Sequence, residues 1–414
     1  MPRRELARPA AFWTVAVLLV LMLAASGVPS PLYRVYAEEF GFGSGVITVV
    51  FAVYAFALLV SLLVVGGLSD HVGRRPVLAV ALVLEAVSMV LFLAADGVGW
   101  LLAARIVQGF ATGAMTGAFG AALLDLQRAE RPLGPLVNSA APGFGLSLGA
   151  VGAGLAVEYL PSPTDWVFGL LTALCLLAAV GVWIFLPETS ARLPGAAASL
   201  RPSVHVPARQ RRAFVVVLPC LIATWALGGL YASLGPSLVA GVFGVQDHVV
   251  GSLLILALNG TGLIGSLTMR GVVPARGMVI GALVFAVGVA GTVAALSSGS
   301  LTFFFVAAVV SGFGFGSAFL GAMATVTRGV EPGHRAGLLA AVFTASYLAF
   351  SLPAIAAGIA ANHIGLERTA QVYGVGVIVL ALLAVAGLAL HARRPVTPAP
   401  DTAVHARSTA SVAD

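Results

Sequence analysis

The sequence has very little charge. Only 9% of its 414 residues are Asp, Glu, Lys or Arg, whereas a soluble globular domain carries about 25%. Hydrophobic residues make up 59% of the chain, and the mean hydropathy is +1.03. A chain with so few charges cannot cover its surface in water, so we expect most of it to lie in lipid.

Lysine is absent, and all 22 basic residues are arginine. A net charge of +6 would favour nucleic-acid binding in a soluble protein. Here the arginines fall in short loops between apolar runs, where they indicate membrane topology instead. We therefore expect no nucleic-acid partner.

Cysteine and histidine form no recognisable site. The two cysteines, Cys175 and Cys220, both lie in apolar runs and are interpreted as small core residues. The seven histidines are scattered over loops and helix ends, without a Ser/His/Asp or metal-ligand spacing: His71, His205, His248, His334, His363, His391 and His405. We expect neither an enzyme nor a metal or cofactor site.

What the sequence does contain is a series of long apolar runs. A helix needs about 20 apolar residues to cross a bilayer, and it satisfies its own backbone hydrogen bonds there. The first run is predicted to be an uncleaved transmembrane helix rather than a signal peptide. The twelve predicted spans are 11–31, 45–66, 76–95, 100–123, 136–158, 165–186, 213–235, 248–269, 277–298, 301–326, 336–361 and 370–391.

The arginines predict the orientation of these spans. If the N-terminus is cytoplasmic, 19 arginines fall in inner segments, Arg34 and Arg368 fall in outer loops, and Arg105 lies within a span. Positive residues favour the cytoplasmic side. We expect a multi-pass protein of the cell (plasma) membrane with both termini in the cytoplasm.

A polar, arginine-rich loop after the sixth span divides the chain into two sets of six spans. The predicted parts are residues 1–186, the cytoplasmic linker 187–212, residues 213–391, and a short polar tail, 392–414, that is predicted to be disordered. The halves also resemble each other at offsets of 203 or 204 residues. The matching pairs are 40–41 with 243–244, 107–113 with 310–316, and 147–156 with 351–360.

Duplicated halves of six spans are typical of secondary transporters, which bind their substrate between the halves near the middle of the membrane. A channel is disfavoured because the chain has no filter sequence. We expect a small-molecule substrate and a monomer.

The loop between the second and third spans reads GGLSDHVGRRP, from Gly66 to Pro76. Its pattern is Gly66, Asp70, Gly73, Arg74 and Arg75. This pattern and the two halves resemble the major facilitator superfamily over about residues 11 to 391. The resemblance implies an all-α membrane protein with 12 transmembrane helices in two pseudo-symmetric six-helix bundles. It also implies transport by alternating access.

The resemblance further implies a conformational latch in this loop. Glycines permit close helix contact and a tight turn at Gly66 and Gly73, and Asp70 needs a positive partner because it follows a helix C-terminus. In the family, the loop's arginine meets an acid when the transporter faces outward, which here assigns Asp70, Arg74 and Asp125 to the latch. The other motif residues, Gly66, Gly73 and Arg75, are counted with it. The alternative is that Arg74 and Arg75 only set topology.

Two ionisable residues lie within predicted spans. Arg105, Gln108 and Gly109 match an Arg-x-x-Gln-Gly pattern of the family, which implies a role in proton coupling or in helix packing. A centred arginine costs about 2.5–3.5 kcal/mol on insertion scales. Glu85 is a functional candidate by its position alone, although the resemblance places its helix at the periphery, where it would instead pair with a neighbouring helix.

The fifth span does not match a pattern that is common in the drug exporters of the family. Proton-coupled drug exporters of the family often carry a Gly-Pro signature late in this helix, followed by paired glycines. Here Pro142 comes early and follows Ala141. The signature is absent or altered, and this keeps a symporter open as the alternative.

A substrate pocket needs a few polar groups on apolar walls. The candidates are Tyr54, Gln108, Thr112, Trp225, Tyr231, Asn259, Ser311, Tyr347 and Ser351. The set carries no charge, which favours a neutral or lipophilic substrate. The sequence therefore predicts proton-coupled export of small, largely apolar compounds, as in drug efflux by an antiporter. The alternative is proton-coupled uptake of a small metabolite.

Overall fold

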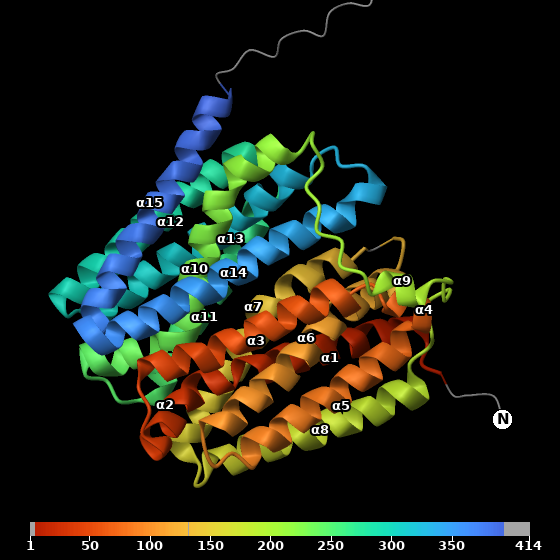
Figure 1. Cartoon of the computed structure of the whole chain (residues 1–414), viewed down its shortest axis with the longest axis horizontal. Helices are drawn as coiled ribbons and strands as arrows, with labels where there is room; N and C mark the ends of the chain where they lie inside the picture. The colour runs from red at the N-terminus through yellow and green to blue at the C-terminus, as the bar shows by residue number, and fades with distance from the viewer. Residues whose placement is uncertain (1–4, 131, 393–414) are drawn as a thin grey trace, which may run out of the picture.

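The computed structural model of the protein, shown in Figure 1, describes residues 5–130 and 132–392. All of its elements are α-helices, and within these ranges twelve segments are long and apolar enough to cross a membrane. The expected all-α membrane fold is therefore confirmed. The elements are α1 (Arg8–Gly27), α2 (Pro29–Phe40), α3 (Ser44–Val65), α4 (Ser69–Val72), α5 (Arg74–Leu93), α6 (Val98–Leu126), α7 (Gly134–Tyr159), α8 (Pro163–Phe185), α9 (Ala196–Ser199), α10 (Arg211–Phe243), α11 (His248–Thr268), α12 (Pro274–Ser298), α13 (Leu301–Thr327), α14 (Pro332–Ile364) and α15 (Leu366–Ala392).

Most predicted spans end within a few residues of the observed helices, but the first and seventh are longer than predicted. The first span continues past Val28 as α2, so the segment from Pro29 to Phe40 is helical rather than a loop. The seventh, α10, passes Pro236 and ends eight residues after the predicted end at 235. Proline is tolerated in such helices because neighbouring groups satisfy the freed backbone.

The internal repeat has a counterpart in backbone geometry. The Phe-Gly pairs at 40–41 and 243–244 both end a helix, α2 and α10. Gly41 has φ +68° and Gly244 has φ +70°, a left-handed conformation that favours glycine and terminates helices. At equivalent positions in the two halves, a helix therefore ends in the same backbone conformation.

Glycines also bring equivalent helix pairs together. On α6, a Cβ added at Gly113 would lie 2.6 Å from the Cβ of Ser61 on α3. On α13, a Cβ added at Gly316 would lie 2.8 Å from the Cα of Gly262 on α11. Only small residues allow backbones to approach this closely, so the repeated glycines of the fourth and tenth spans act as packing surfaces.

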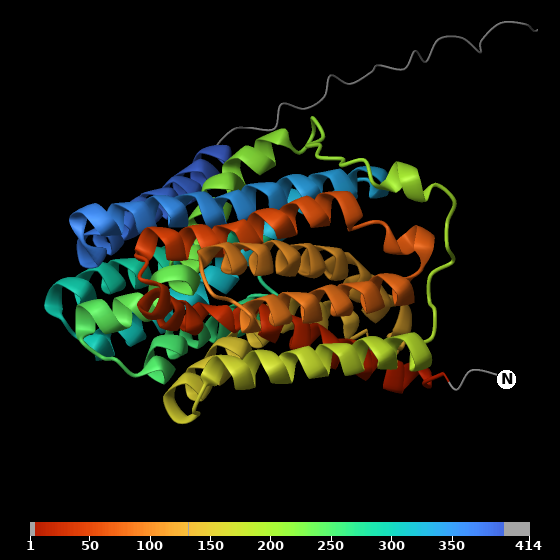
Figure 2. The same cartoon turned by 60° about the horizontal axis from the view of Figure 1, so that its bottom comes forward.

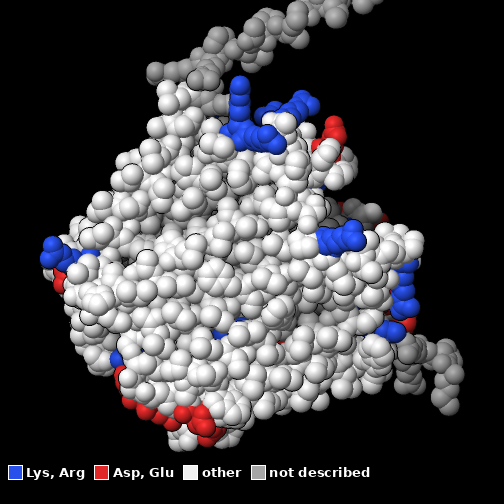
Figure 3. Space-filling model, viewed as in Figure 1, with Lys and Arg blue, Asp and Glu red and all other residues white. Residues whose placement is uncertain are grey.

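Charged side chains mark two opposite ends of the helices. In the view of Figure 3, the broad middle of the molecular surface between these ends is almost entirely uncharged. We define the arginine-rich side as the end of the helices where the linker between α8 and α10 runs (Figures 1 and 2). The described arginines other than Arg34, Arg105 and Arg368 lie on it. The opposite end is the arginine-poor side.

The two halves share an extended apolar core toward the arginine-poor side. That cluster includes Leu32, Phe51 and Leu101 from the first half and Leu230, Leu254 and Phe304 from the second. Toward the arginine-rich side each half has its own cluster. These contain Phe12, Leu78 and Phe119 in the first half, and Val217, Met278 and Leu338 in the second.

Polar contacts between the halves also lie on the arginine-poor side. Arg34 donates a hydrogen bond of 2.7 Å to Gln246. The backbone N–H of His248 donates to Glu158 at 3.2 Å, and the His248 ring lies 3.5 Å from the same carboxylate. The structure is thus closed toward the arginine-poor side.

We predict opposite effects for two glycines of α7. A Cβ at Gly149 would overlap the backbone of Ala24 on α1, whereas one at Gly152 would meet nothing within 4 Å. Overpacking costs about 1–3 kcal/mol, so Gly149→Ala should lower the melting temperature in detergent. Gly152→Ala should leave it unchanged or raise it, because alanine favours a helix over glycine by about 0.5–1 kcal/mol. Equal effects of the two substitutions would contradict this packing.

Candidate functional site

The structure brings the predicted latch residues together at the arginine-rich end of the first half. Gly73 has φ +113° and makes the turn between α4 and α5. The Arg74 side chain forms an ion pair with Asp70, lies 3.4 Å from Asp125 Oδ2, and donates a 2.7 Å hydrogen bond to Ser69. The predicted close approach at Gly66 is also present, because a Cβ at Gly117 of α6 would lie 3.4 Å from the Gly66 Cα.

Glu188, in the linker, joins this group and was missed from the sequence. Its carboxylate accepts hydrogen bonds from the backbone N–H groups of Arg74, at 2.8 Å, and Arg75, at 3.3 Å. An acidic group at a helix N-terminus is favourable, so Glu188 caps α5. The neighbouring Thr189 donates a 2.9 Å hydrogen bond to Asp125. The only signal in the sequence was an acid directly after Pro187, more than a hundred residues from its partners.

All of these latch contacts belong to the first half and the linker. In the described chain, Arg74 has no ion-pair partner from α10–α15. The ion pairs seen here therefore do not join the two halves. Arg75, the fifth residue of the motif, takes no part in them and instead lies over the Trp183 ring of α8, with its Cζ 5.4 Å from the ring centre.

Arg105 lies at the centre of a buried polar network within the first half. Its side chain is 1% exposed. Its Nε donates a 2.6 Å hydrogen bond to the Tyr33 hydroxyl on α2, and Nη1 donates to Gln108 and to the Ser26 carbonyl. Its Cζ also lies 5.0–5.7 Å from three ring centres, those of Tyr33, Tyr54 and Phe92.

Glu85 belongs to the same network through Gln108. The Gln108 side-chain nitrogen donates a 2.9 Å hydrogen bond to Glu85 Oε1 and a 3.1 Å hydrogen bond to the Ala25 carbonyl. Glu85 is fully buried, and its second oxygen, Oε2, has no hydrogen-bond partner among the described residues. Helix α5 thus directs its one mid-span carboxyl inward, toward α6, instead of toward lipid.

Tyr54 connects this network with the second half. One face of its ring meets the Arg105 guanidinium, and the side chain also packs in a small apolar cluster with Tyr347 and Phe350 of α14. Phe350 packs at a tilt against Phe51 of α3 across the halves, with ring centres 4.9 Å apart. The buried charges are therefore one side chain away from the contact between the halves.

An aromatic cluster lines the second half at this contact. Trp225 of α10 lies edge-on to Tyr347 at 5.0 Å and to Phe350 at 5.7 Å, and Phe319 of α13 lies 5.9 Å from Trp225. We call Trp225, Phe319, Tyr347 and Phe350 the aromatic cluster. Its members Trp225 and Tyr347 were predicted from the sequence, whereas Phe319 and Phe350 were not, because an apolar ring carries no signal of its own.

Three buried polar atoms in or next to the aromatic cluster have no hydrogen-bond partner among the described residues: Trp225 Nε1, Ser346 Oγ and Ser351 Oγ. Most other buried hydroxyls on the helices donate to the carbonyl four residues earlier, as Thr344 does to Ala340 at 2.7 Å. Buried polar groups normally find a partner. These three atoms therefore offer hydrogen bonds that the described chain leaves unused.

The remaining predicted pocket residues lie apart from the aromatic cluster. Thr112 is buried within the first half, where its hydroxyl lies 3.2 Å from that of Ser26. Asn259 bonds to the Ile255 carbonyl and faces Gly143 of α7 across the halves. Tyr231 bonds to Thr292 at 3.1 Å, and Ser311 packs against Gly288, so both are enclosed within the second half.

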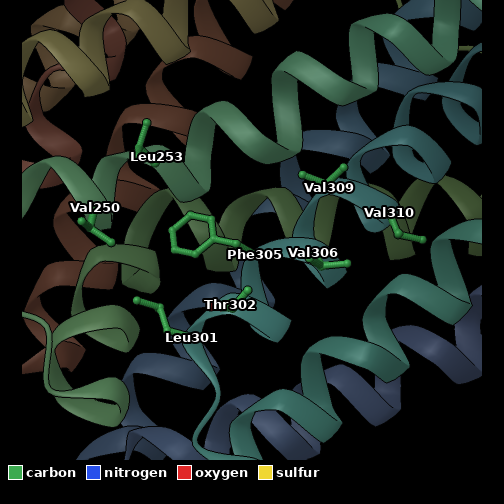
Figure 4. A pocket seen from close by; sticks show the side chains of 8 residues that line it. All are labelled: Val250, Leu253, Leu301, Thr302, Phe305, Val306, Val309 and Val310. Carbon is green, nitrogen blue, oxygen red and sulfur yellow. The ribbon is translucent and has the colours of Figure 1, made fainter.

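An apolar groove of about 520 Å³ lies elsewhere, between α11 and α13. Figure 4 shows its lining, which is entirely apolar except for Thr302. Val306 and Val309 of this lining are among the exposed side chains, so the groove opens to the surroundings of the helices. Within the described residues, no three His, Cys, Asp or Glu side chains lie close enough to share a metal ion.

Comparisons with known proteins agree with this architecture. An MFS-type transporter, paaT, of Penicillium rubens is 30% identical over 155 residues, which cover 37% of this chain and 28% of that protein. The class C tetracycline resistance protein of Escherichia coli is 39% identical over 110 residues, 26% of this chain and 27% of that protein. The chain thus matches less than a third of the length of either relative.

Among solved structures, the chain resembles a bacterial homolog of the human lysosomal transporter Spinster in an inward-facing and occupied conformation. The TM-score is 0.70 at 14% identity, and the match covers 93% of this chain and 97% of the other. The sequence model of the Major Facilitator Superfamily matches residues 15–276. With twelve spans, the loop motif and this match over more than half of its length, the chain belongs to the Major Facilitator Superfamily.

Proposed function

We propose that this protein is a secondary active transporter that exports small, largely apolar compounds in exchange for protons. It works by alternating access in the cell membrane, with both termini in the cytoplasm. The excess of arginine assigns the arginine-rich side to the cytoplasm. With the halves packed together at the arginine-poor side, the structure then corresponds to the inward-facing state.

The observation that carries this proposal is an unbroken series of contacts from a buried carboxyl to the contact between the halves. It runs from Glu85 through Gln108 to Arg105, and from Arg105 through Tyr54 to Tyr347 and Phe350. Exchange requires that proton binding and substrate binding influence each other. Here one side chain, Tyr54, touches both the charged network and the aromatic cluster.

Glu85 is the proton carrier in this mechanism. Its free oxygen, Oε2, accepts the proton, while Oε1 keeps its hydrogen bond from Gln108. Protonation removes the negative charge that balances Arg105. The guanidinium then relies more on the Tyr33 hydroxyl and on the rings around it, and Tyr54 transmits this change to the second half.

The aromatic cluster defines the chemistry of the substrate. Four rings, with Trp225 edge-on to the other three, supply an apolar surface, and the unused Trp225, Ser346 and Ser351 groups supply hydrogen-bond donors. No charged side chain belongs to this set. A neutral planar compound with acceptor oxygens fits such a surface. The similarity to a tetracycline resistance protein supports export.

Proton-coupled uptake of a small metabolite is the second candidate. Pro142 in α7 follows Ala141, so the Gly-Pro signature that often accompanies drug export is altered. The same proton site would serve a symporter. Direction of transport therefore has to be measured.

Direction is tested in inside-out vesicles that hold the purified protein, an acidic lumen and a pH-sensitive dye. Proton release on adding a planar apolar drug, with none from protein-free vesicles, would support exchange. Silence with every drug, together with a metabolite-driven proton flux in right-side-out vesicles, would replace export with uptake. Silence in both arrangements would contradict proton-coupled transport.

We predict that Glu85→Gln abolishes substrate-driven proton movement, because the amide keeps the shape of the side chain but cannot carry the proton. Substrate binding, measured by quenching of tryptophan fluorescence, should change less than threefold. Glu39→Gln, an exposed residue on α2, is the matched control and should transport normally. Proton flux of wild-type size in Glu85→Gln would remove Glu85 from the mechanism.

We predict that Asp70→Asn slows transport at least tenfold with little loss of stability. The Asp70 carboxyl is half exposed, and exposed ion pairs contribute only about 0–1 kcal/mol, so the melting temperature should change by no more than a few degrees. Transport slows because the substitution is expected to weaken the latch in the outward-facing state. Arg201→Gln, which removes an exposed linker charge, serves as the control. Normal transport by Asp70→Asn would reduce the motif to a topology signal.

A further inference from the structure

Arg75 has a charge that the described protein leaves unbalanced. The residue is 8% exposed, and its Nε is buried without a hydrogen-bond partner. No carboxylate of the described residues lies within ion-pair distance of its guanidinium, whereas the adjacent Arg74 pairs with both Asp70 and Asp125. A buried charge without a partner is costly, so this arrangement calls for an anion from outside the chain.

The nearest carboxylate, Glu188, is already engaged. It accepts the backbone N–H of Arg75, and it also binds the N–H groups of Arg74, Thr189 and Ser190. Its remaining ionic contact, 3.8 Å long, is with Arg192. The Arg75 guanidinium instead lies 5.4 Å over the ring of Trp183, which orients it but does not neutralise it.

Trp183 places this pair at the lipid boundary. It is 51% exposed and lies two residues before Phe185, the arginine-rich end of α8. Tryptophan is enriched at the level of lipid headgroups. Arg75, in the first turn of α5, lies at the same level. Toward the middle of the membrane, α5 and α8 expose only apolar side chains near this point, including Val80, Val83, Leu177 and Val180.

We propose that an anionic phospholipid from the leaflet on the arginine-rich side binds at this end of α5 and α8. Its phosphate pairs with the Arg75 guanidinium, which can donate two parallel hydrogen bonds to phosphate oxygens. The Trp183 ring holds the guanidinium plane in place, and the acyl chains lie along the apolar strip of α5 and α8. Basic sites between helices on the cytoplasmic side are a known way of binding such headgroups.

The site is independent of transport, so its test does not require a substrate. The full-length protein in detergent is titrated with dioctanoyl phosphatidylglycerol, and its melting temperature is followed. Dioctanoyl phosphatidylcholine, which has the same chains and no net charge, is the matched lipid. Glycerol 3-phosphate and inorganic phosphate test whether the headgroup alone is enough.

We expect phosphatidylglycerol to raise the wild-type melting temperature by several degrees, and phosphatidylcholine and the free phosphates to have little effect. Arg75→Gln should weaken the apparent affinity for phosphatidylglycerol at least tenfold, and Trp183→Leu several-fold. Arg201→Gln, at an exposed linker arginine, and Trp166→Leu, at an exposed tryptophan near the opposite end of α8, should bind like the wild type.

Equal responses of the wild type and Arg75→Gln would overturn the proposal, as would equal responses to the two lipids. A free phosphate that matches phosphatidylglycerol would overturn the lipid as the ligand. If Arg75→Gln fails to fold, Arg75→Lys replaces it. Lysine keeps the charge but loses the planar fork, so an affinity loss of several-fold is expected, and none would contradict the proposed geometry.

Discussion

The first half of this protein is organised around the cost of burying one positive charge. Arg105 is 1% exposed in the middle of a membrane protein, where a centred arginine costs about 2.5–3.5 kcal/mol on insertion scales. Its hydrogen bonds come from α1, α2 and α6, and its cation–π contacts come from α2, α3 and α5. The position of five helices therefore depends on keeping this guanidinium satisfied.

Glycine makes that arrangement possible. The network requires α6 to lie close to α3, and Gly109 and Gly113 allow it because their backbones touch those of Tyr54 and Leu58. The second half repeats the contact with Gly312 and Gly316 against α11, but it has no counterpart of Arg105. The duplication thus preserved the packing, while the buried charge is found in one half. The buried Arg105 and Glu85 thus lie in the first half, and the aromatic cluster lies in the second.

The sequence alone predicted most of the fold because the bilayer restricts the choices. Twelve apolar runs have few alternatives to twelve helices, and only the first and seventh spans extend well beyond their predicted ends. The site was harder to predict. Arg105, Gln108 and Tyr54 stood out as polar groups in apolar surroundings. Tyr33 and Glu188 did not, because Tyr33 falls beyond the predicted end of the first span at residue 31, and Glu188 follows a helix end. Their partners are distant in sequence, so no local pattern identified them.

The position of Tyr54 decides how the two halves can communicate. Its ring lies against the Arg105 guanidinium and packs in one cluster with Tyr347 and Phe350, so separating the halves at this level would break one of these contacts. Any change of access must therefore alter the surroundings of Arg105, and through Gln108 those of Glu85. By linkage, a change in the charge of Glu85 must alter the preference for one access state over the other. Under the proposed mechanism, packing couples the Glu85 proton site to the conformational change, whichever direction the substrate takes.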